Sequence, residues 1–313
     1  MFILRVEIKK YTSMPHNILI SGGTGLVGSQ LIPALHSKGH KISLLSRSKG
    51  DGSESVFQWN HKESYIQKGA FDGVDTLVHL AGAGVADKRW TDDRKKEIIE
   101  SRTLSSNLLF ETLKNQPNQV KTLVAASAIG YYGMDTGDQL MTETSVSGND
   151  FLAHVVKEWE ASTKQFESLG IRVVQIRIGV VLAKEGGALP KILQPPVAAP
   201  LASGHQYMSW IHMNDLVGII VKAIEDEKMT GVFNAVAPKP ENNRDFTKLA
   251  AKAFRKIYLP IPVPGFLLKL ILGEMAQIVM GGNKVSAQKI QNAGYNFQFG
   301  ELEGALSHLA RKA

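Results

Sequence analysis

Short apolar segments that end in glycines alternate with stretches of helical spacing along the first two thirds of the chain. Residues 17–23 (NILISGG) have the continuous apolar character of a buried strand that runs into a turn, and residues 41–46 (KISLLS) resemble a second strand. Between them, apolar side chains recur at helical spacing at Leu26, Val27, Leu31, Ile32 and Leu35. Gly39 follows, at the position where a glycine commonly ends a helix. The pattern predicts a strand, a glycine turn, a helix and a second strand, the beginning of a right-handed crossover unit.

The same alternation continues as far as residue 237. Further strands are expected over 74–82, 120–128, 171–182 and 231–237, and helices over 91–113, 151–168 and 215–227. Thr91 is a suitable N-cap for the first of these helices, because Asp92 and Asp93 follow it where the helix dipole favours acids. Strands that alternate with helices predict an α/β fold with a doubly wound, mostly parallel sheet.

The character of the chain changes after residue 182. Glycine and proline become frequent as far as residue 204, and from 238 onward the apolar positions form two helical faces, at 246–254 and at 266–280. The expected units are an N-terminal extension (1–13), a large sheet domain (14–182, to which 207–237 returns) and a smaller, mostly helical domain on the substrate side (183–206 and 238–313).

Composition narrows the class of protein. Hydrophobic residues make up 43% and charged residues 21% of the 313 residues, which is ordinary for a globular protein and excludes a disordered or collagen-like chain. Cysteine is absent, which excludes disulfides and a cysteine nucleophile and is compatible with a reducing cytosol. No apolar run has the length and continuity of a secretion signal or a membrane span. We therefore expect a cytoplasmic protein that does not enter a membrane.

Charge and spacing exclude two further classes. The 36 Lys and Arg residues exceed the 29 Asp and Glu residues by seven, and this surplus is spread along the chain. A nucleic-acid-binding protein usually gathers such charge into one patch or stripe, so no nucleic-acid partner is expected. No cluster of His, Asp and Glu has the spacing of metal ligands, so no metal is expected either.

The turn after the first strand carries glycines at three-residue intervals, at Gly22, Gly25 and Gly28. A pyrophosphate must come close to backbone N–H groups at the start of the following helix, and a Cβ would block that approach. Because the motif lies between a strand and a helix, it predicts a dinucleotide site, with a merely tight turn as the alternative. The residues expected to contact the cofactor here are Gly22, Thr24, Gly25, Leu26, Val27 and Gly28.

The end of the second strand indicates which dinucleotide binds. An acid there would bond the ribose 2′-hydroxyl of NAD, whereas an arginine accommodates the 2′-phosphate of NADP. Ser46, Arg47, Ser48 and Lys49 place two cations and two hydroxyls at this position, which suits a phosphate dianion. Asp51 is a rival acid that lies farther from the strand, and a solvated basic turn is the other alternative. NADP(H) is therefore expected in preference to NAD(H).

Several motifs together resemble those of the short-chain dehydrogenase/reductase superfamily. They are HLAGA at 79–83, SAIGYYG at 127–133, RIGVVL at 177–182 and the tail GEMAQIVMGGNKVSAQKIQNAGYNFQF at 273–299. Over residues 16–306 the chain is similar, more narrowly, to the epimerase family protein subgroup, whose members end in a small domain of unknown function. The resemblance implies a Rossmann-type sheet domain and further cofactor contacts at Leu80, Ala81, Gly82, Ile178 and Gly179.

The resemblance also raises a question about catalysis. Members of the superfamily usually use a serine, a tyrosine and a lysine, because hydride transfer at carbon leaves charge on an oxygen that needs an acid or base nearby. Ser127 matches the serine and Lys157 the lysine, but the tyrosine position, four residues before the lysine, is Ala153. Tyr131 and Tyr132 are the candidates for the missing phenol, with packing as their alternative role. Lys157 is either a ribose contact or a surface lysine.

Two functions from different classes remain open. The first is an NADP(H)-dependent oxidoreductase or epimerase-like enzyme that transfers hydride to or from a carbonyl or hydroxyl of an unknown small molecule. A nucleotide sugar is one alternative, although Met208 stands where sugar-nucleotide members often have an arginine. The second is a non-catalytic NADP(H)-binding sensor or scaffold, which the missing tyrosine supports. Monomer and homodimer are both compatible with the sequence.

Four basic residues in and beside the helix expected over 91–113 form either a solvated face or a contact for an anionic substrate: Arg89, Arg94, Lys95 and Arg102.

Overall fold

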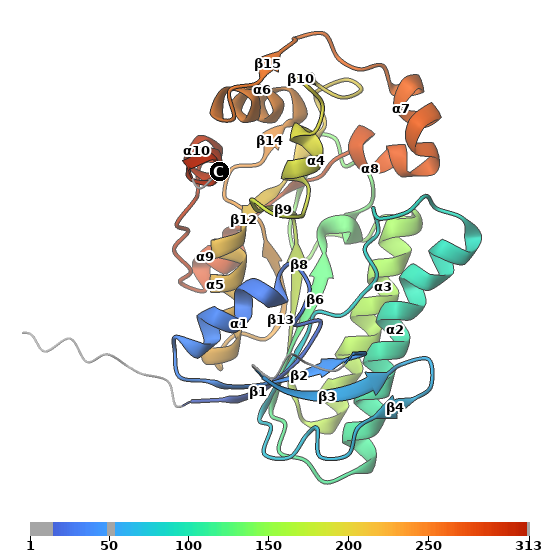
Figure 1. The fold of residues 1–313 in the computed structure, drawn as a ribbon, viewed down its shortest axis with the longest axis vertical. Helices are drawn as coiled ribbons and strands as arrows, with labels where there is room; N and C mark the ends of the chain where they lie inside the picture. Colours follow the sequence, from blue (N-terminus) through green and yellow to red (C-terminus); the bar gives the residue numbers. More distant parts are fainter. Residues whose placement is uncertain (1–14, 49–53, 312–313) are drawn as a thin grey trace, which may run out of the picture.

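An eight-stranded sheet forms the centre of the molecule (Figure 1). The computed structural model describes residues 15–48 and 54–311. The strands of the sheet are β1 (Asn17–Ser21), β2 (Lys41–Ser46), β3 (Ser55–Asn60), β4 (Tyr65–Ile66), β5 (Thr76–His79), β6 (Thr122–Ala128), β8 (Arg172–Ile178) and β13 (Gly231–Ala235). They follow the spatial order β13-β8-β6-β5-β1-β2-β3-β4, and all neighbours are parallel except β3 and β4. The carboxyl ends of seven strands therefore meet at one edge of the sheet.

Short strands form two-stranded pairs outside the central sheet. They are β7 (Leu140–Met141), β9 (Val180–Leu182), β10 (Val197–Ala198), β11 (Tyr207–Met208), β12 (Trp210–His212), β14 (Glu241–Asn242), β15 (Ile257–Tyr258) and β16 (Lys284–Val285). The pairs are β12 with β9, β10 with β15, β11 with β14 and β16 with β7. Each pair joins segments that lie far apart in sequence, so the later part of the chain is fastened to the earlier part.

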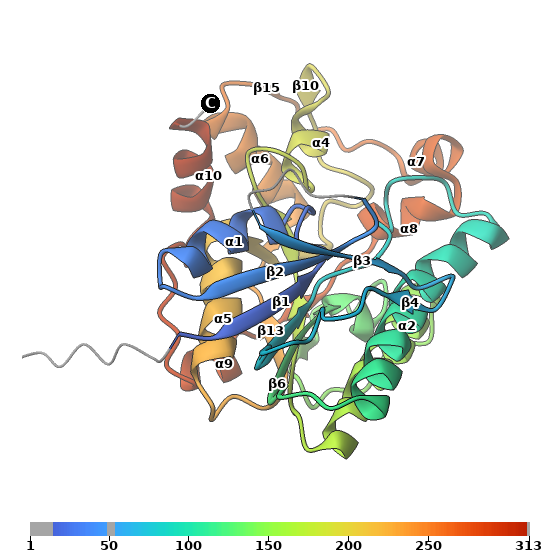
Figure 2. The same ribbon diagram turned by 60° about the horizontal axis from the view of Figure 1, so that its bottom comes forward.

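Helices cover both faces of the sheet (Figure 2). One face is covered by α1 (Gly28–His36), α5 (Met213–Glu225) and α9 (Gln288–Asn292), and the other by α2 (Asp92–Asn115), α3 (Phe151–Lys164) and the 3₁₀ helix η2 (Gln165–Leu169). Successive side chains of a strand point to opposite faces, so Ile18 and Ile20 of β1 enter the first apolar cluster and Leu19 enters the second. Burial on both faces explains the uninterrupted apolar runs of the central strands.

The C-terminal part of the chain stands beyond the carboxyl ends of β6 and β8 (Figure 1). The 3₁₀ helix η1 (Ile129–Tyr132) follows β6 directly. The remaining helices of the described residues are α4 (Leu189–Leu193), α6 (Asn243–Ala253), α7 (Gly265–Leu272), η3 (Gly273–Met275), α8 (Ala276–Met280) and α10 (Leu302–Arg311). A third apolar cluster, which contains Trp210, Phe246 and Leu306, joins α6 and α10 to β9 and β12. Helical units thus overhang the edge at which the parallel strands end.

The structure confirms the predicted α/β fold and several local signals. Thr91 caps α2, because its side chain accepts a hydrogen bond from the N–H of Arg94. The α-helix predicted over 151–168 ends at Lys164 and continues as a 3₁₀ helix, which Gly170 terminates in a left-handed conformation. These signals are local in sequence, which is why they could be recognised without tertiary information.

Other predictions differ from the structure. The single strand predicted over 171–182 is broken at Gly179, where a Cβ would lie 2.8 Å from the side chain of Val236. The chain turns there, and β9 leaves the sheet to pair with β12. The apolar segment 266–280, expected as one helical face, forms two short α-helices with a 3₁₀ turn between them, and its Phe266 and Leu270 are 74% and 75% exposed. No helix in the described residues is long and apolar enough to cross a membrane.

Candidate functional site

The three glycines of the turn between β1 and α1 differ in what surrounds them. A Cβ on Gly22, whose φ is +79°, would lie 2.8 Å from backbone atoms of Leu80 and Ala81. A Cβ on Gly28 would overlap the carbonyl oxygen of Gly22. At Gly25, the only described atom near such a Cβ, apart from its chain neighbours, is that same oxygen at 3.2 Å. Gly22 and Gly28 are therefore required by the packing of the chain on itself, whereas Gly25 lies on the open side of the turn.

Backbone donors are free at the start of α1. Val27 precedes the helix and provides no side-chain cap, and the N–H groups of Leu26 and Val27 donate to no atom of the described chain. The N–H of Gly25 donates within the turn to the carbonyl of Gly22 at 3.1 Å. Thr24 is exposed at the tip of the turn. Because the positive end of the helix dipole lies here too, the open side of the turn fits a phosphate group.

A basic side chain follows β2 at the same edge of the sheet. β2 lies parallel to β1, so the residues after β2 stand next to the glycine turn. Ser46 Oγ accepts a hydrogen bond from the N–H of Ser48 at 3.2 Å, and the exposed Arg47 between them makes no ion pair with the described residues. Lys49 and Asp51 lie outside the described residues. The structure thus brings Ser46, Arg47 and Ser48 to the candidate cofactor site.

The loop after β5 forms another wall of this site. Leu80 and Ala81 are in backbone contact with Gly22, as described above. The exposed backbone of Gly82 covers the guanidinium of Arg102, because a Cβ at Gly82 would lie 3.2 Å from Arg102 Cζ. The cofactor contacts that the resemblance implies at Leu80, Ala81 and Gly82 therefore lie beside the turn.

Ser127, near the end of β6, is held in a buried polar network. Its hydroxyl donates to Glu160 Oε1 at 2.6 Å, and its exposed fraction is 2%. Glu160 on α3 forms a bidentate ion pair with Arg177 on β8, with N–O distances of 2.7 and 2.8 Å. Arg177 Nη1 also donates to the hydroxyl of Tyr132 at 3.1 Å, and that hydroxyl donates to Asn234 Oδ1 at 2.7 Å. We call these five residues the Glu160–Arg177 network.

Protonation within the network follows from burial and from the ion pair. Burial alone would lower the pKa of Arg177, but the hydrogen bonds and the charge of Glu160 raise it above its ordinary value. Burial raises the pKa of Tyr132, against the opposing effect of Arg177. Tyr132 therefore keeps its proton at neutral pH, and its hydroxyl is engaged on two sides.

Tyr131 is placed differently from Tyr132. It is half-buried, and its hydroxyl has no hydrogen-bond partner among the described residues. The guanidinium of Arg177 stacks on its ring, with Cζ 3.4 Å from the ring centroid. Of the two tyrosine hydroxyls, that of Tyr131 is therefore the one not engaged by the Glu160–Arg177 network.

The structure does not bring Lys157 into the network. Its side chain is exposed on α3, whereas Ala153 and Glu160 of the same helix are buried. Ile178 and Gly179 lie where β8 ends, and the N–H of Gly179 donates to the carbonyl of Ala235 at 3.1 Å. Their cofactor contacts, like the catalytic roles of Ser127 and Lys157, stay predictions.

A buried histidine contacts the residue that precedes the glycine turn. His79, at the end of β5, is 1% exposed, and its Nδ1 lies 2.5 Å from Ser21 Oγ, directly before the glycine turn. Its Nε2 lies 3.1 and 3.2 Å from the hydroxyls of Ser106 and Ser105 on α2. Burial, and secondly the charge of Arg102, lowers the pKa of His79 to about 3, so its imidazole is neutral at physiological pH.

Sequence reasoning missed Glu160, Asn234 and His79. Glu160 had a usable signal, because it follows Ala153 at helical spacing on a face that is otherwise apolar, where an acid requires a partner. Asn234 and His79 gave no such signal, since each lies in a strand whose neighbours only the folded sheet defines.

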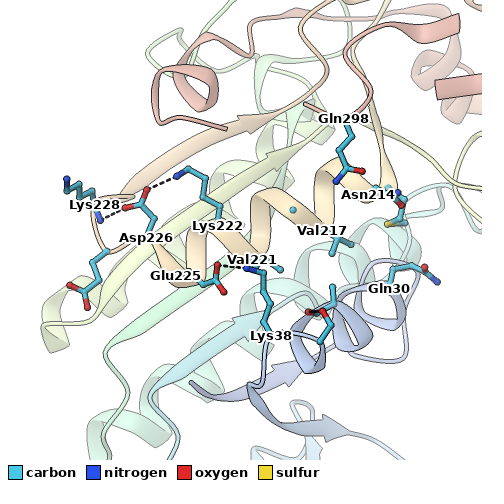
Figure 3. Close-up of a pocket in the computed structure, with 15 residues that line it drawn as sticks. Gln30, Lys38, Asn214, Val217, Val221, Lys222, Glu225, Asp226, Lys228 and Gln298 are labelled. Carbon is cyan, nitrogen blue, oxygen red and sulfur yellow. Dashed lines mark hydrogen bonds and ion pairs between the residues drawn. The ribbon is translucent and has the colours of Figure 1, made fainter. Parts of the chain in front are cut away.

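A large cavity lies away from these residues. Its volume is about 1070 Å³, and it is situated between α1 and α5 (Figure 3). Four of its charged lining side chains form ion pairs, Lys38 with Glu225 at 2.9 Å and Lys222 with Asp226 at 2.8 Å. Because these four charges are already paired and the glycine turn lies outside the lining, we assign the candidate site to the sheet edge.

The parallel sheet, helices on both faces and the glycine turn before α1 define the Rossmann class of nucleotide-binding α/β proteins. Residues 18–235 match the model of the NAD dependent epimerase/dehydratase family, and residues 263–309 match a domain of unknown function (DUF1731). The chain belongs to the NAD dependent epimerase/dehydratase family. The resemblance deduced from the sequence motifs is thereby confirmed.

Known proteins are similar to this chain over nearly its whole length. An epimerase family protein of Staphylococcus aureus (strain MRSA252), SAR0825, is 37% identical over 301 residues, which cover 94% of this chain and 99% of that protein. The crystal structure of human epimerase family protein SDR39U1 (isoform 2) with NADPH matches with a TM-score of 0.87 and 30% identity, over 95% of this chain and all of that one. A nucleoside-diphosphate sugar epimerase from Corynebacterium glutamicum matches with a TM-score of 0.76 and 31% identity, over 95% of this chain and 58% of that one.

Proposed function

We propose that this protein is an NADP(H)-dependent oxidoreductase or epimerase-like enzyme that acts on a carbonyl or hydroxyl group. The observation that carries the proposal is the glycine turn, with free N–H groups at Leu26 and Val27 and an open side at Gly25. The human protein of 30% identity whose crystal structure contains NADPH supports the choice of cofactor. A cytoplasmic location, expected from the absence of cysteine, belongs to the same proposal.

NADP(H) is preferred over NAD(H) in this proposal because of Arg47. Arg47 is exposed and flanked by Ser46 and Ser48 after β2, and an arginine at the end of this strand supports binding of the 2′-phosphate of the adenine ribose. Calorimetric titration of the purified protein with NADPH and with NADH should give the tighter binding with NADPH. In Arg47→Asp we expect the affinity for NADPH to fall at least about tenfold, because a charge-assisted contact is replaced by repulsion, while NADH binds no more weakly.

The control for that variant is Lys41→Asp, at the other end of the same strand, which reverses a charge far from the proposed 2′-phosphate site. Lys41→Asp should bind NADPH nearly as the wild type does. Equal affinities of Arg47→Asp and wild type for NADPH would refute the assignment of the 2′-phosphate to Arg47.

Reduction of a carbonyl requires a hydride on carbon and a proton on oxygen. NADPH, when bound, supplies the hydride. Tyr131 donates the proton from its free hydroxyl, and the guanidinium of Arg177 above its ring stabilises the phenolate that remains. Glu160 fixes Arg177 in this position, and Ser127 fixes Glu160, so Ser127 acts as a positioning residue. In the reverse direction, the Tyr131 phenolate accepts the proton of a substrate hydroxyl.

Tyr131→Phe tests this chemistry. Turnover of NADPH by the wild type is first sought on a panel of aldehydes, quinones and nucleotide sugars. On any substrate found, the variant should lose about 10²- to 10⁴-fold in kcat, because the proton donor is removed, while its affinity for NADPH is unchanged. Tyr132→Phe is the matched control. It should lower the free energy of unfolding, because the Tyr132 hydroxyl is buried between Asn234 and Arg177, and it should lower kcat much less than Tyr131→Phe does. A Tyr131→Phe variant with wild-type kcat would contradict the assignment.

A second candidate function is a non-catalytic NADP(H) sensor. It is favoured by the placement of the residues that match the usual catalytic serine and lysine: the Ser127 hydroxyl is bonded to Glu160, and Lys157 is exposed. A sensor would bind NADPH, gain thermal stability from it and turn over nothing on the panel. Turnover that depends on Tyr131 would exclude this alternative.

A further inference from the structure

Arg102, on α2, is a buried cation for which the described chain provides no counter-charge. Its exposed fraction is 8%, and no carboxylate of the described residues lies within 4.0 Å of its guanidinium. Its Nη1 donates to the carbonyl of Ile98 in its own helix at 2.8 Å and lies 3.5 Å from Ser101 Oγ. Its Nε is buried without any partner. Burial, and secondly the charge of Arg94, lowers the pKa of Arg102 to about 10, so the guanidinium remains charged at neutral pH.

A second unbonded donor lies beside it. The guanidinium of Arg102 stacks on the ring of Trp159 from α3, with Cζ 4.8 Å from the ring centroid, and Trp159 Nε1 is also buried without a partner. Two neighbouring buried N–H donors without acceptors are unusual, because almost all buried polar groups in proteins are hydrogen-bonded. An acceptor with negative charge would compensate the charge of Arg102.

The position of this cation connects it to the candidate site. The guanidinium lies directly under Gly82, where a Cβ would be 3.2 Å from Arg102 Cζ, and Gly82 is exposed in the wall beside the glycine turn. Glycine at this position is what lets the guanidinium approach the surface of the site so closely. A buried charge without a partner is costly to the folded protein, and such groups commonly serve a ligand.

We propose that Arg102 is an anion-binding residue, which takes a phosphate or carboxylate oxygen of a ligand seated over Gly82. The inference deepens the proposed function, on which it rests, by assigning an anionic group to what binds at this edge. That group belongs either to the substrate or to the diphosphate of the cofactor. The chemistry is the same in both cases, and the sources are distinguished by experiment.

Arg94 offers a matched control. It lies on the same helix and is 7% exposed, but it has a carboxylate partner: its Nη1 donates to Glu97 at 2.7 Å and its Nη2 to the carbonyl of Gly84, and only its Nε is buried without a partner. Arg102→Met keeps the volume and removes the charge, Arg102→Lys keeps the charge and loses the planar donor set, and Arg94→Met removes a buried arginine that already has partners.

Calorimetry on these proteins uses three probes: NADPH, and then inorganic phosphate and malonate titrated into protein saturated with NADPH. If the substrate supplies the anion, wild-type protein binds phosphate or malonate, Arg102→Met weakens this at least tenfold, and NADPH affinity changes less than twofold. If the cofactor supplies it, Arg102→Met weakens NADPH itself at least tenfold. In either case Arg102→Lys should lie between wild type and Arg102→Met, and Arg94→Met should bind within twofold of wild type.

Thermal melting separates a ligand-binding role from a structural one. Without ligand, Arg102→Met should melt at or above the temperature of the wild type, because an uncompensated buried charge is removed. The proposal is overturned if Arg102→Met binds NADPH, phosphate and malonate as the wild type does, whatever its melting temperature. If the wild type does not bind NADPH, the proposed function fails, while titration of ligand-free wild type and Arg102→Met with phosphate still tests Arg102.

Discussion

Among single residues, buried charge takes two forms in this protein. Arg177 is neutralised by a bidentate carboxylate, and the hydroxyls of Ser127 and Tyr132 complete its surroundings. Arg102 has no described carboxylate within 4.0 Å. In the first arrangement, loss of the carboxylate would leave a charge unpaired in the interior, whereas in the second no carboxylate of the described residues pairs with the charge. Removal of the carboxylate that pairs with Arg177 should therefore lower stability, whereas removal of the unpaired charge of Arg102 should not.

Glu160→Gln tests the first arrangement. Removal of the carboxylate charge leaves the Arg177 guanidinium buried and unpaired, and we expect the free energy of unfolding to fall by about 3–5 kcal/mol. The measurement is urea denaturation followed by circular dichroism. Glu303→Gln, which breaks the exposed ion pair with Lys252, is the control and should have no measurable effect. A stability of Glu160→Gln close to that of wild type would mean that the ion pair is not formed in solution.

His79 predicts a pH dependence of stability. Its pKa is about 3 in the folded protein and about 6.5 in the unfolded chain, so the unfolded state binds the extra proton between these values. The stability contribution is complete above pH 6.5 and is lost as the pH falls towards 3, at about 1.4 kcal/mol per pH unit from this residue.

Urea denaturation of wild type and His79→Gln at pH 7.5, 6.5, 5.5 and 4.5 isolates the effect of His79. Both proteins lose stability in acid through their carboxylates, but the wild type should lose it more steeply below pH 6.5. Parallel curves for the two proteins would show that His79 is not a buried neutral imidazole.

Among elements of secondary structure, the turn between β1 and α1 contains glycines in two different surroundings. Gly28 is enclosed by backbone atoms of Gly22 and Gly23, whereas the side of Gly25 is open except for one carbonyl oxygen. The same residue type thus serves two purposes within four positions. One glycine closes the strand against the helix, and the other leaves room for the approach of a ligand.

Two alanine variants should show this separation. Gly28→Ala should lower the free energy of unfolding by about 2–4 kcal/mol, because its Cβ overlaps backbone that cannot move without opening the turn. Gly25→Ala should leave stability within about 1 kcal/mol of wild type but weaken NADPH at least tenfold, because the methyl group occupies the space at the helix start. Gly304→Ala in α10, where a Cβ meets nothing within 4 Å, is the control for both measurements. Unchanged NADPH binding by Gly25→Ala would locate the dinucleotide elsewhere.

Most elements could be predicted from the sequence, because their signals are local. The glycine turn, the capping residue Thr91 and the apolar runs of β1 and β6 each lie within a few consecutive residues. The Glu160–Arg177 network could not be predicted, because the partner of Glu160 is fixed by how α3 packs on the sheet. The break at Gly179 escaped for the same reason, since the atoms that a Cβ would meet there belong to Ser209 and Val236 in later segments.

At the scale of the whole molecule, Asp215 fastens the C-terminal segment to the sheet domain. This residue of α5 is fully buried and accepts hydrogen bonds from Tyr295 Oη at 3.0 Å and from the backbone N–H groups of Gln298 and Phe299 at 2.8 and 3.0 Å. One carboxylate therefore satisfies donors from three positions of a segment that enters α10. This carboxylate adds a polar attachment to the apolar cluster that joins α10 to β9 and β12.

Asp215→Ala should lower the free energy of unfolding by about 2–4 kcal/mol, because two partly buried backbone donors and the Tyr295 hydroxyl lose their acceptor. Hydrogen exchange read by mass spectrometry should show loss of protection in residues 295–311 before the central sheet is affected. Glu227→Ala, an exposed acid just beyond the same helix, is the control and should change neither measurement. Uniform loss of protection throughout the molecule would contradict a local fastening.

The position of β13 at the edge of the sheet has a consequence for biosynthesis. Asn234, which accepts a hydrogen bond from the Tyr132 hydroxyl, lies in this strand, and its N–H donates to Glu143 at 2.9 Å. A growing polypeptide has made Ser127, Glu160 and Arg177 long before residue 234 leaves the ribosome. Until then the Tyr132 hydroxyl of the nascent chain lacks its acceptor. Strand β8 likewise lacks its neighbour β13, so its hydrogen-bonding edge stays unpaired until translation reaches residues 231–235.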